Sequence, residues 1–114
     1  MARNPESFDR LAALDKSVHE PARLAILTAL SACRSAQFRF LQSLTGLTQG
    51  NLSIHLTKLA EKGFIEIEKR FDGRYPATNV RLTPAGRKAI SEHWRQLDGL
   101  RAAAETIGND QNLE

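Results

Sequence analysis

The chain has 114 residues, of which 41% are hydrophobic and 25% charged, and its formal net charge is +3. This length allows one ordinary domain, and the composition is that of a folded protein rather than a disordered one. No apolar run reaches the roughly 18 residues of a membrane span, and the N-terminus lacks the apolar stretch of a signal peptide. The single cysteine excludes an internal disulfide. We therefore expect a cytoplasmic protein that is not bound to a membrane, and the mildly basic charge favours a polyanionic partner.

The N-terminal region, residues 1–19, is predicted to be an arm that carries one short helix. Apolar residues recur at helical spacing between Phe8 and about Val18. They place Leu11, Leu14 and Val18 on one face of that helix. We expect this face to complete a dimer interface.

Two further helices are predicted before the middle of the chain. Pro21 suits the first position of a helix, where its missing N–H is not needed, and this helix should end near Arg34. Cys33 falls on its apolar stripe, so it is interpreted as a packed small hydrophobe, with a redox switch as the alternative. The segment Phe38 to Leu44 is predicted to be a short, strongly apolar helix.

The most informative break is the segment Thr-Gly-Leu-Thr at residues 45–48. Gly46 can adopt a positive φ that ends one helix, and Thr48 can cap the next. The new helix is predicted over residues 49–62, with three leucines on its buried face: Leu52, Leu56 and Leu59. Two helices joined by a short turn with a glycine form a helix-turn-helix.

The pattern then changes from helical to alternating. Apolar and charged residues largely alternate over residues 64–71, Asp72-Gly73 is a turn dipeptide, and a second alternating strand ends at Leu82. Together they predict a β-hairpin with a basic tip. Pro84 then opens a last helix that runs to Ile107, about 36 Å if unbroken, with Gly99 as its weak point. Residues 108–114 are predicted to be a disordered tail.

Two sequence segments resemble a known family. Residues 52–65 read LSIHLTKLAEKGFI, close to the pattern (V/L)-S-x-H-L-x-x-L-x-x-x-G-(L/F)-(V/I) of small MarR- and ArsR-type regulators. Residues 80–87 read VRLTPAGR, similar to the strand-to-helix segment L-T-x-x-G-R of the same families. The resemblance implies a mainly α fold with a small β-hairpin wing. It also implies a winged helix-turn-helix domain over residues 20–83 and a dimerisation helix over residues 84–107.

The resemblance also implies how the protein acts, as a sequence-specific transcriptional regulator that binds duplex DNA. The helix over residues 49–62 would enter the major groove, and the wing over residues 69–78 would touch the backbone or the minor groove. Gln and Asn in the first turn suit adenine edges, and Ile54 suits a thymine methyl, although packing against a neighbouring helix explains Ile54 equally well. The candidate DNA-binding residues are Thr48, Gln49, Gly50, Asn51, Ser53, Ile54, His55, Lys58, Lys69, Arg70, Arg74 and Arg81.

A homodimer is the second expectation. An apolar seam along the last helix continues past the point that a body of this size could cover. The candidate interface residues are Leu11, Leu14, Val18, Trp94, Leu97, Leu100, Ala104 and Ile107. The alternative is that this helix folds back near Gly99.

Other classes of function have less support in the sequence. The three histidines and one cysteine are scattered, so we expect no metal site and no cofactor. No catalytic motif stands out, so we expect no enzyme. A winged helix that binds protein instead of DNA remains the alternative function, and nothing in the sequence indicates a small-molecule effector.

Overall fold

The computed structural model describes residues 14–111, apart from the side chains of Asp72 and Gln111. Three helices come first, with one very short strand between them: α1 (Pro21–Ser31), β1 (Ala36–Gln37), α2 (Phe38–Thr45) and α3 (Gln49–Glu61). A hairpin and a long helix follow: β2 (Ile65–Asp72), β3 (Tyr75–Leu82) and α4 (Pro84–Gln111). This order confirms the predicted winged helix-turn-helix fold.

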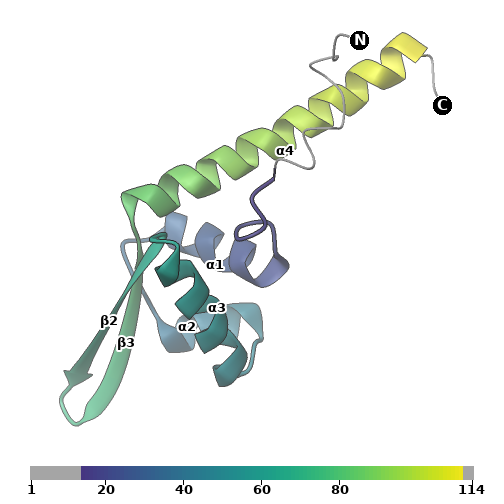
Figure 1. The fold of residues 1–114 in the computed structure, drawn as a ribbon. Helices are drawn as coiled ribbons and strands as arrows, with labels where there is room; N and C mark the ends of the chain where they lie inside the picture. Colours follow the sequence, from purple (N-terminus) through teal and green to yellow (C-terminus); the bar gives the residue numbers. More distant parts are fainter. Residues whose placement is uncertain (1–13, 112–114) are drawn as a thin grey trace.

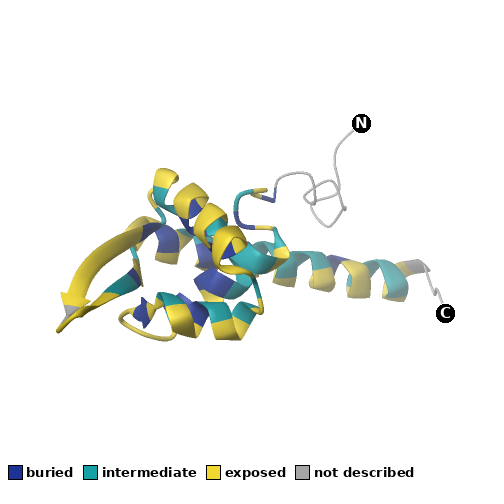
Figure 2. Cartoon of the chain, turned by 90° about the horizontal axis from the view of Figure 1, so that it is seen from below, coloured by how far each residue is buried: buried dark blue, intermediate teal, exposed yellow. Residues whose placement is uncertain are grey.

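The core lies where α1, α2 and α3 meet the base of the hairpin. Each helix contributes leucines or isoleucines with almost no exposed surface, and the sheet closes the core with Ile65 and Val80. The burial of this shared apolar surface holds the base of the hairpin against the helices. Figure 2 shows the result, with buried residues in the helical body and at the base of the hairpin and exposed residues towards its tip.

The sheet is antiparallel and has the strand order β1-β3-β2. Ile67 pairs with Val80 and Phe71 with Pro76, so the two long strands stay in register to the turn, where Gly73 has a φ of 67°. The sequence pattern missed β1, because a two-residue strand has no alternation to detect. β3 begins at Tyr75, a start that the sequence pattern did not give. Pro76 is tolerated there because β1 pairs only with Asn79 and Val80, which leaves one side of β3 free at that point.

Helix α4 runs without a break through Gly99 and beyond the predicted end at Ile107. The prediction of a disordered tail is therefore wrong for residues 108–111, while residues 112–114 lie outside the described part. The physical reason is that extending an existing helix adds one hydrogen bond per residue without a new nucleation cost. At about 1.5 Å per residue, 28 residues give a helix of about 42 Å that projects past the body (Figure 1).

The described end of the predicted helix from Phe8 to Val18 is not helical. Residues 14–20 form turns and bends, and residues 8–13 lie outside the described part. Asp15 is the cause, because its carboxylate accepts hydrogen bonds from the amide and the hydroxyl of Ser17 at 2.8 and 2.6 Å. These bonds lower the pKa of Asp15, and they offer the backbone an alternative to the helical ladder.

Cys33 is exposed, which corrects the prediction that it packs in the core. Helix α1 ends at Ser31 rather than near Arg34, because the amides of Ala32 and Cys33 turn back to the carbonyls of Ala29 and Leu30. Such bonds tighten the last turn of a helix and rotate the residues that follow. Cys33 therefore leaves the apolar stripe, and its Sγ lies 3.4 Å from the Ala29 carbonyl oxygen.

Candidate functional site

One face of α3 is fixed to the interior. Leu52 and Leu59 are fully buried, and Leu56 is 2% exposed. The spacing of these leucines by four and three residues defines the inner face of the helix. Residues on the opposite face must then point outwards, and Gly50, Ile54 and Thr57 are all exposed. Ile54 is 54% exposed, so packing against another helix does not explain it.

The turn before α3 contains the glycine that ends α2 and the threonine that caps α3, as predicted. Gly46 ends α2 with a φ of 70°, in the left-handed region that favours glycine. The hydroxyl of Thr48 accepts a hydrogen bond from the Asn51 amide at 3.2 Å. Leu47 packs on the core next to the leucines of α3, which fixes the angle at which the chain enters the helix. The first turn of α3, including Gln49 and Asn51, is therefore held rigidly and left exposed.

A cleft of about 790 Å³ separates α3 from the hairpin. Polar side chains at four-residue spacing line its helical wall: Gln49, Ser53 and Thr57. Lys69 stands on the hairpin side of the same cleft. Amide, hydroxyl and ammonium groups that converge from two elements can hydrogen-bond a polar, negatively charged ligand.

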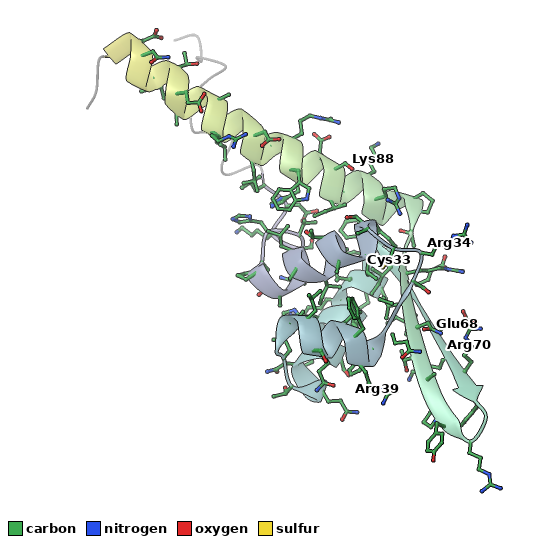
Figure 3. All side chains as sticks on the ribbon, turned by 180° about the vertical axis from the view of Figure 1, so that it is seen from behind. Cys33, Arg34, Arg39, Glu68, Arg70 and Lys88 are labelled. Atoms are coloured by element: carbon green, nitrogen blue, oxygen red, sulfur yellow. The ribbon has the colours of Figure 1, made fainter. Side chains whose placement is uncertain are left out.

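The register of the hairpin separates its candidate cations. Arg70 and Arg81 lie on the face turned away from the helices, because they alternate with the inward-facing Ile67 and Val80. Arg81 is paired with Glu66, to which its Nε donates at 2.9 Å. Arg70 Nε lies 3.8 Å from a carboxylate oxygen of Glu68, and Figure 3 shows both side chains on this outer side. These two arginines therefore lie outside the cleft, whereas Lys69 lines it.

His55 also departs from the predicted arrangement. Its side chain is 20% exposed, and its Nδ1 lies 3.6 Å from a carboxylate oxygen of Glu20. Glu20 caps α1 by accepting a hydrogen bond from the Arg23 amide at 2.9 Å. The half-buried His55 thus joins α3 to the start of α1. Lys58 and Asn51, on the same flank of α3, remain exposed.

The structure adds three residues that the sequence reasoning missed. Thr57 continues the polar row of α3, Tyr75 stands on the hairpin side of the cleft, and Arg39 comes from the first turn of α2 (Figure 3). The four-residue spacing from Gln49 could have identified Thr57. Arg39 carried no such signal, because only the packing of α2 against α1 and the sheet places it at the cleft.

The predicted dimer residues fall into two groups. Leu14 and Val18 are 6% and 1% exposed within their own chain, so they are not available to a partner in this form, and Leu11 lies outside the described residues. Along α4, Trp94 and Ala104 are exposed, whereas a further set is half-buried: Leu97, Leu100 and Ile107.

The long helix is anchored to the body through His93, which is 2% exposed. Its Nε2 lies 3.3 Å from Nδ1 of His19, and its pKa is lowered by burial and then by His19, while Asp15 acts in the opposite direction. Within residues 14–111, no three histidine, cysteine or carboxylate side chains converge as metal ligands. In the same range, no helix has both the length and the apolar character to cross a membrane.

Comparison with known proteins gives the same fold. The sequence profile of the winged helix DNA-binding domain matches residues 22–100. An uncharacterized protein of Methanocaldococcus jannaschii is 33% identical over 78 residues, which cover 68% of this chain and 85% of that protein.

Two solved structures extend the comparison to regulators. A transcriptional regulator homologue from Pyrococcus horikoshii is 30% identical and has a TM-score of 0.71, over 88% of this chain and 98% of that one. A MarR-family transcriptional regulator from Silicibacter pomeroyi is 27% identical and has a TM-score of 0.58, over 87% and 66% of the two chains.

Proposed function

Because the chain belongs to the family of winged helix DNA-binding domains, we propose that it reads a specific duplex sequence with α3 and its wing. The family and the fold are those of MarR-like DNA-binding transcriptional regulators, which are not enzymes. The protein would perform this role in the cytoplasm. The observation that supports it best is the complete burial of one face of α3 beside an open polar cleft.

The outer face of α3 suits the major groove, which is about 12 Å wide and admits an α-helix. Gln49 and Asn51 can each bind an adenine edge with two hydrogen bonds, and the exposed Ile54 can contact a thymine methyl. The Thr48 hydroxyl and the free amides of the first turn would hold a phosphate. Ser53, Thr57 and Lys58 would continue the contact along the helix.

The wing would reach the DNA beyond that groove. Arg74, next to Gly73 at the tip, is exposed and suits a narrow minor groove, where the negative potential is strongest. Lys69 would bind the phosphates between the two grooves. Because Arg70 and Arg81 are turned outwards and paired with glutamates, we expect them to contribute less than Arg74.

We also propose that two chains associate through α4. Its apolar seam is only partly covered within one chain, and Trp94 is 42% exposed. A twofold dimer would present two copies of α3 to half-sites about 34 Å apart. A double change in the seam, Trp94→Ala with Leu97→Ala, should raise the monomer fraction in sedimentation experiments and weaken binding to a two-half-site duplex.

The direct test of DNA reading is selection of bound sites from random duplexes, followed by anisotropy titrations with the selected sequence. Asn51→Ala and Gln49→Ala should relax base preference at one or two positions while the fold persists, at a cost of about 1–3 kcal/mol for the best base. Arg74→Ala should weaken binding to all duplexes alike and reduce the salt dependence by about one phosphate contact. Arg81→Ala is the matched control and should change little.

Two results would contradict the proposal. One is the absence of duplex binding at low salt. The other is selection that returns no repeated half-site, which would leave a winged helix that binds another protein.

A further inference from the structure

The tip of the wing carries two aromatic side chains that face solvent. Phe71 is 76% and Tyr75 is 78% exposed, the highest values among the large hydrophobic side chains in the described part of the chain. Aromatic rings gain most from burial, so their exposure at the end of a projecting ribbon indicates a surface that is covered only in a complex. This aromatic pair is separate from the cations already assigned to the wing.

The two rings are adjacent to the elements that would bind DNA. Tyr75 follows Arg74 directly in the chain and stands in the cleft together with Gln49 and Ser53 of α3. Phe71 pairs across the hairpin with Pro76, and Tyr75 pairs with Asp72 in the next position, so both aromatics lie at the turn and leave it from opposite faces of the ribbon. Their placement connects the tip of the wing to the proposed DNA surface.

The length of the hairpin lets the tip reach a second groove. The Ile67–Val80 pair is the last pair along the hairpin that includes a buried residue, and the strand continues to Asp72. Five residues at about 3.3 Å each place the tip roughly 17 Å along the hairpin from this pair. A major groove is about 12 Å wide and a minor groove about 6 Å. With α3 in the major groove, the tip therefore extends over the backbone to the neighbouring minor groove.

We propose that Phe71 and Tyr75 form an aromatic wedge that enters the minor groove and partly unstacks one base step. The inference rests on the proposed function and names a further interaction at the same site. Proteins that insert apolar side chains between base steps in the minor groove bend the duplex and bury more of its surface. Every base has an aromatic face, so this contact adds affinity without reading hydrogen-bond patterns.

The charges around the tip favour DNA over an apolar protein partner. Arg74 lies between the two aromatics in the chain, and Lys69 and Arg70 precede Phe71 on the same strand; all three are exposed. Arg70 is already paired with Glu68, but an apolar docking surface would leave Lys69 and Arg74 uncompensated, whereas the phosphates that flank a minor groove would neutralise them. The aromatic wedge and the surrounding cations therefore match one ligand, duplex DNA.

The test uses the full chain and its selected duplex, with 2-aminopurine placed in turn at each step of the half-site and its flanks. Binding of the unaltered protein should raise the 2-aminopurine fluorescence at one flanking step, because unstacking relieves quenching. The double variant Phe71→Ala with Tyr75→Ala should lose this signal and about tenfold in affinity. The salt slope should stay unchanged in this variant, whereas Arg74→Ala should reduce it by about one unit.

Phe40→Ala is the matched control, since it removes another exposed aromatic ring, on α2, and should leave both signals unchanged. Tyr75→Phe should retain both the fluorescence change and the affinity, because the wedge uses the ring. If the unaltered protein binds the duplex but no step responds, or if the double variant binds within twofold of it, the wedge is refuted while the proposed function stands. Failure of the unaltered protein to bind any duplex would refute both.

Discussion

Gly50 offers a test in which stability and function should change in opposite directions. It lies in the first turn of α3 on the exposed face, and a Cβ added there would meet no atom of the protein within 4 Å. We therefore expect Gly50→Ala to fold without strain. An alanine in a helix is favoured over glycine by about 1 kcal/mol, because it restricts the unfolded chain. The melting temperature should rise by about 4 °C or more.

DNA binding should respond in the opposite way. If α3 lies in the major groove with its first turn against the bases, the absent side chain of Gly50 lets the backbone approach closely. A methyl group forced into a close-packed contact costs about 1–3 kcal/mol. The affinity for the selected duplex should then fall by a factor of about 5 to 150.

The assay combines thermal unfolding with anisotropy titration at one salt concentration. Gly108→Ala is the matched control, because it makes the same change in α4, where an added Cβ also meets no atom within 4 Å. It should stabilise the protein and leave binding unchanged. A Gly50→Ala protein that is more stable and binds as tightly as the original would show that this turn does not face DNA, and the docking of α3 would have to be revised.

Three further predictions concern the scaffold. Gly86→Ala should destabilise despite the better helix propensity, because its Cβ would clash with the Phe64 carbonyl oxygen. Chemical denaturation should show a loss of about 1–3 kcal/mol, and a gain would contradict this packing. Leu56→Ala should cost about 2–5 kcal/mol in the same assay, and a loss below about 1 kcal/mol would show that this face is not fixed to the core. Burial lowers the pKa of His93, so the unfolded chain binds more protons than the folded chain as the pH falls. The free energy of unfolding should therefore decrease as the pH drops below about 6.5. A His93→Gln variant whose free energy of unfolding decreases just as much between about pH 7.5 and 5.5 would refute this linkage.

The parts of the fold that repeat a period could be predicted from the sequence. The leucine spacing in α3 and the alternation in β2 each depend on many residues, so one exception does not hide the signal. The glycine and threonine before α3 act through local chemistry that single residues carry, and their geometry agrees with the prediction. These features were sufficient to locate the helix-turn-helix and the wing.

The wrong predictions concern contacts that the helical or strand periodicity of a sequence does not encode. The Asp15–Ser17 hydrogen bonds replace a helical turn, and the end of α1 rotates Cys33 into solvent although its spacing fits the stripe. His55 points towards Glu20 because α1 and α3 are neighbours in the fold, which a reading of α3 alone misses. The arrangement of Arg70 and Arg81 likewise depends on the register of the hairpin rather than on its composition.

The central claim is that the outer face of α3 and the inner side and tip of the wing meet the same duplex. The most direct measurement is an amide NMR titration of the full chain with the selected duplex. The account predicts that amide shifts concentrate in residues 48–58 and 69–78, and that they weaken as salt is raised. Shifts confined to α1, α2 and α4 with those two segments unchanged would contradict it.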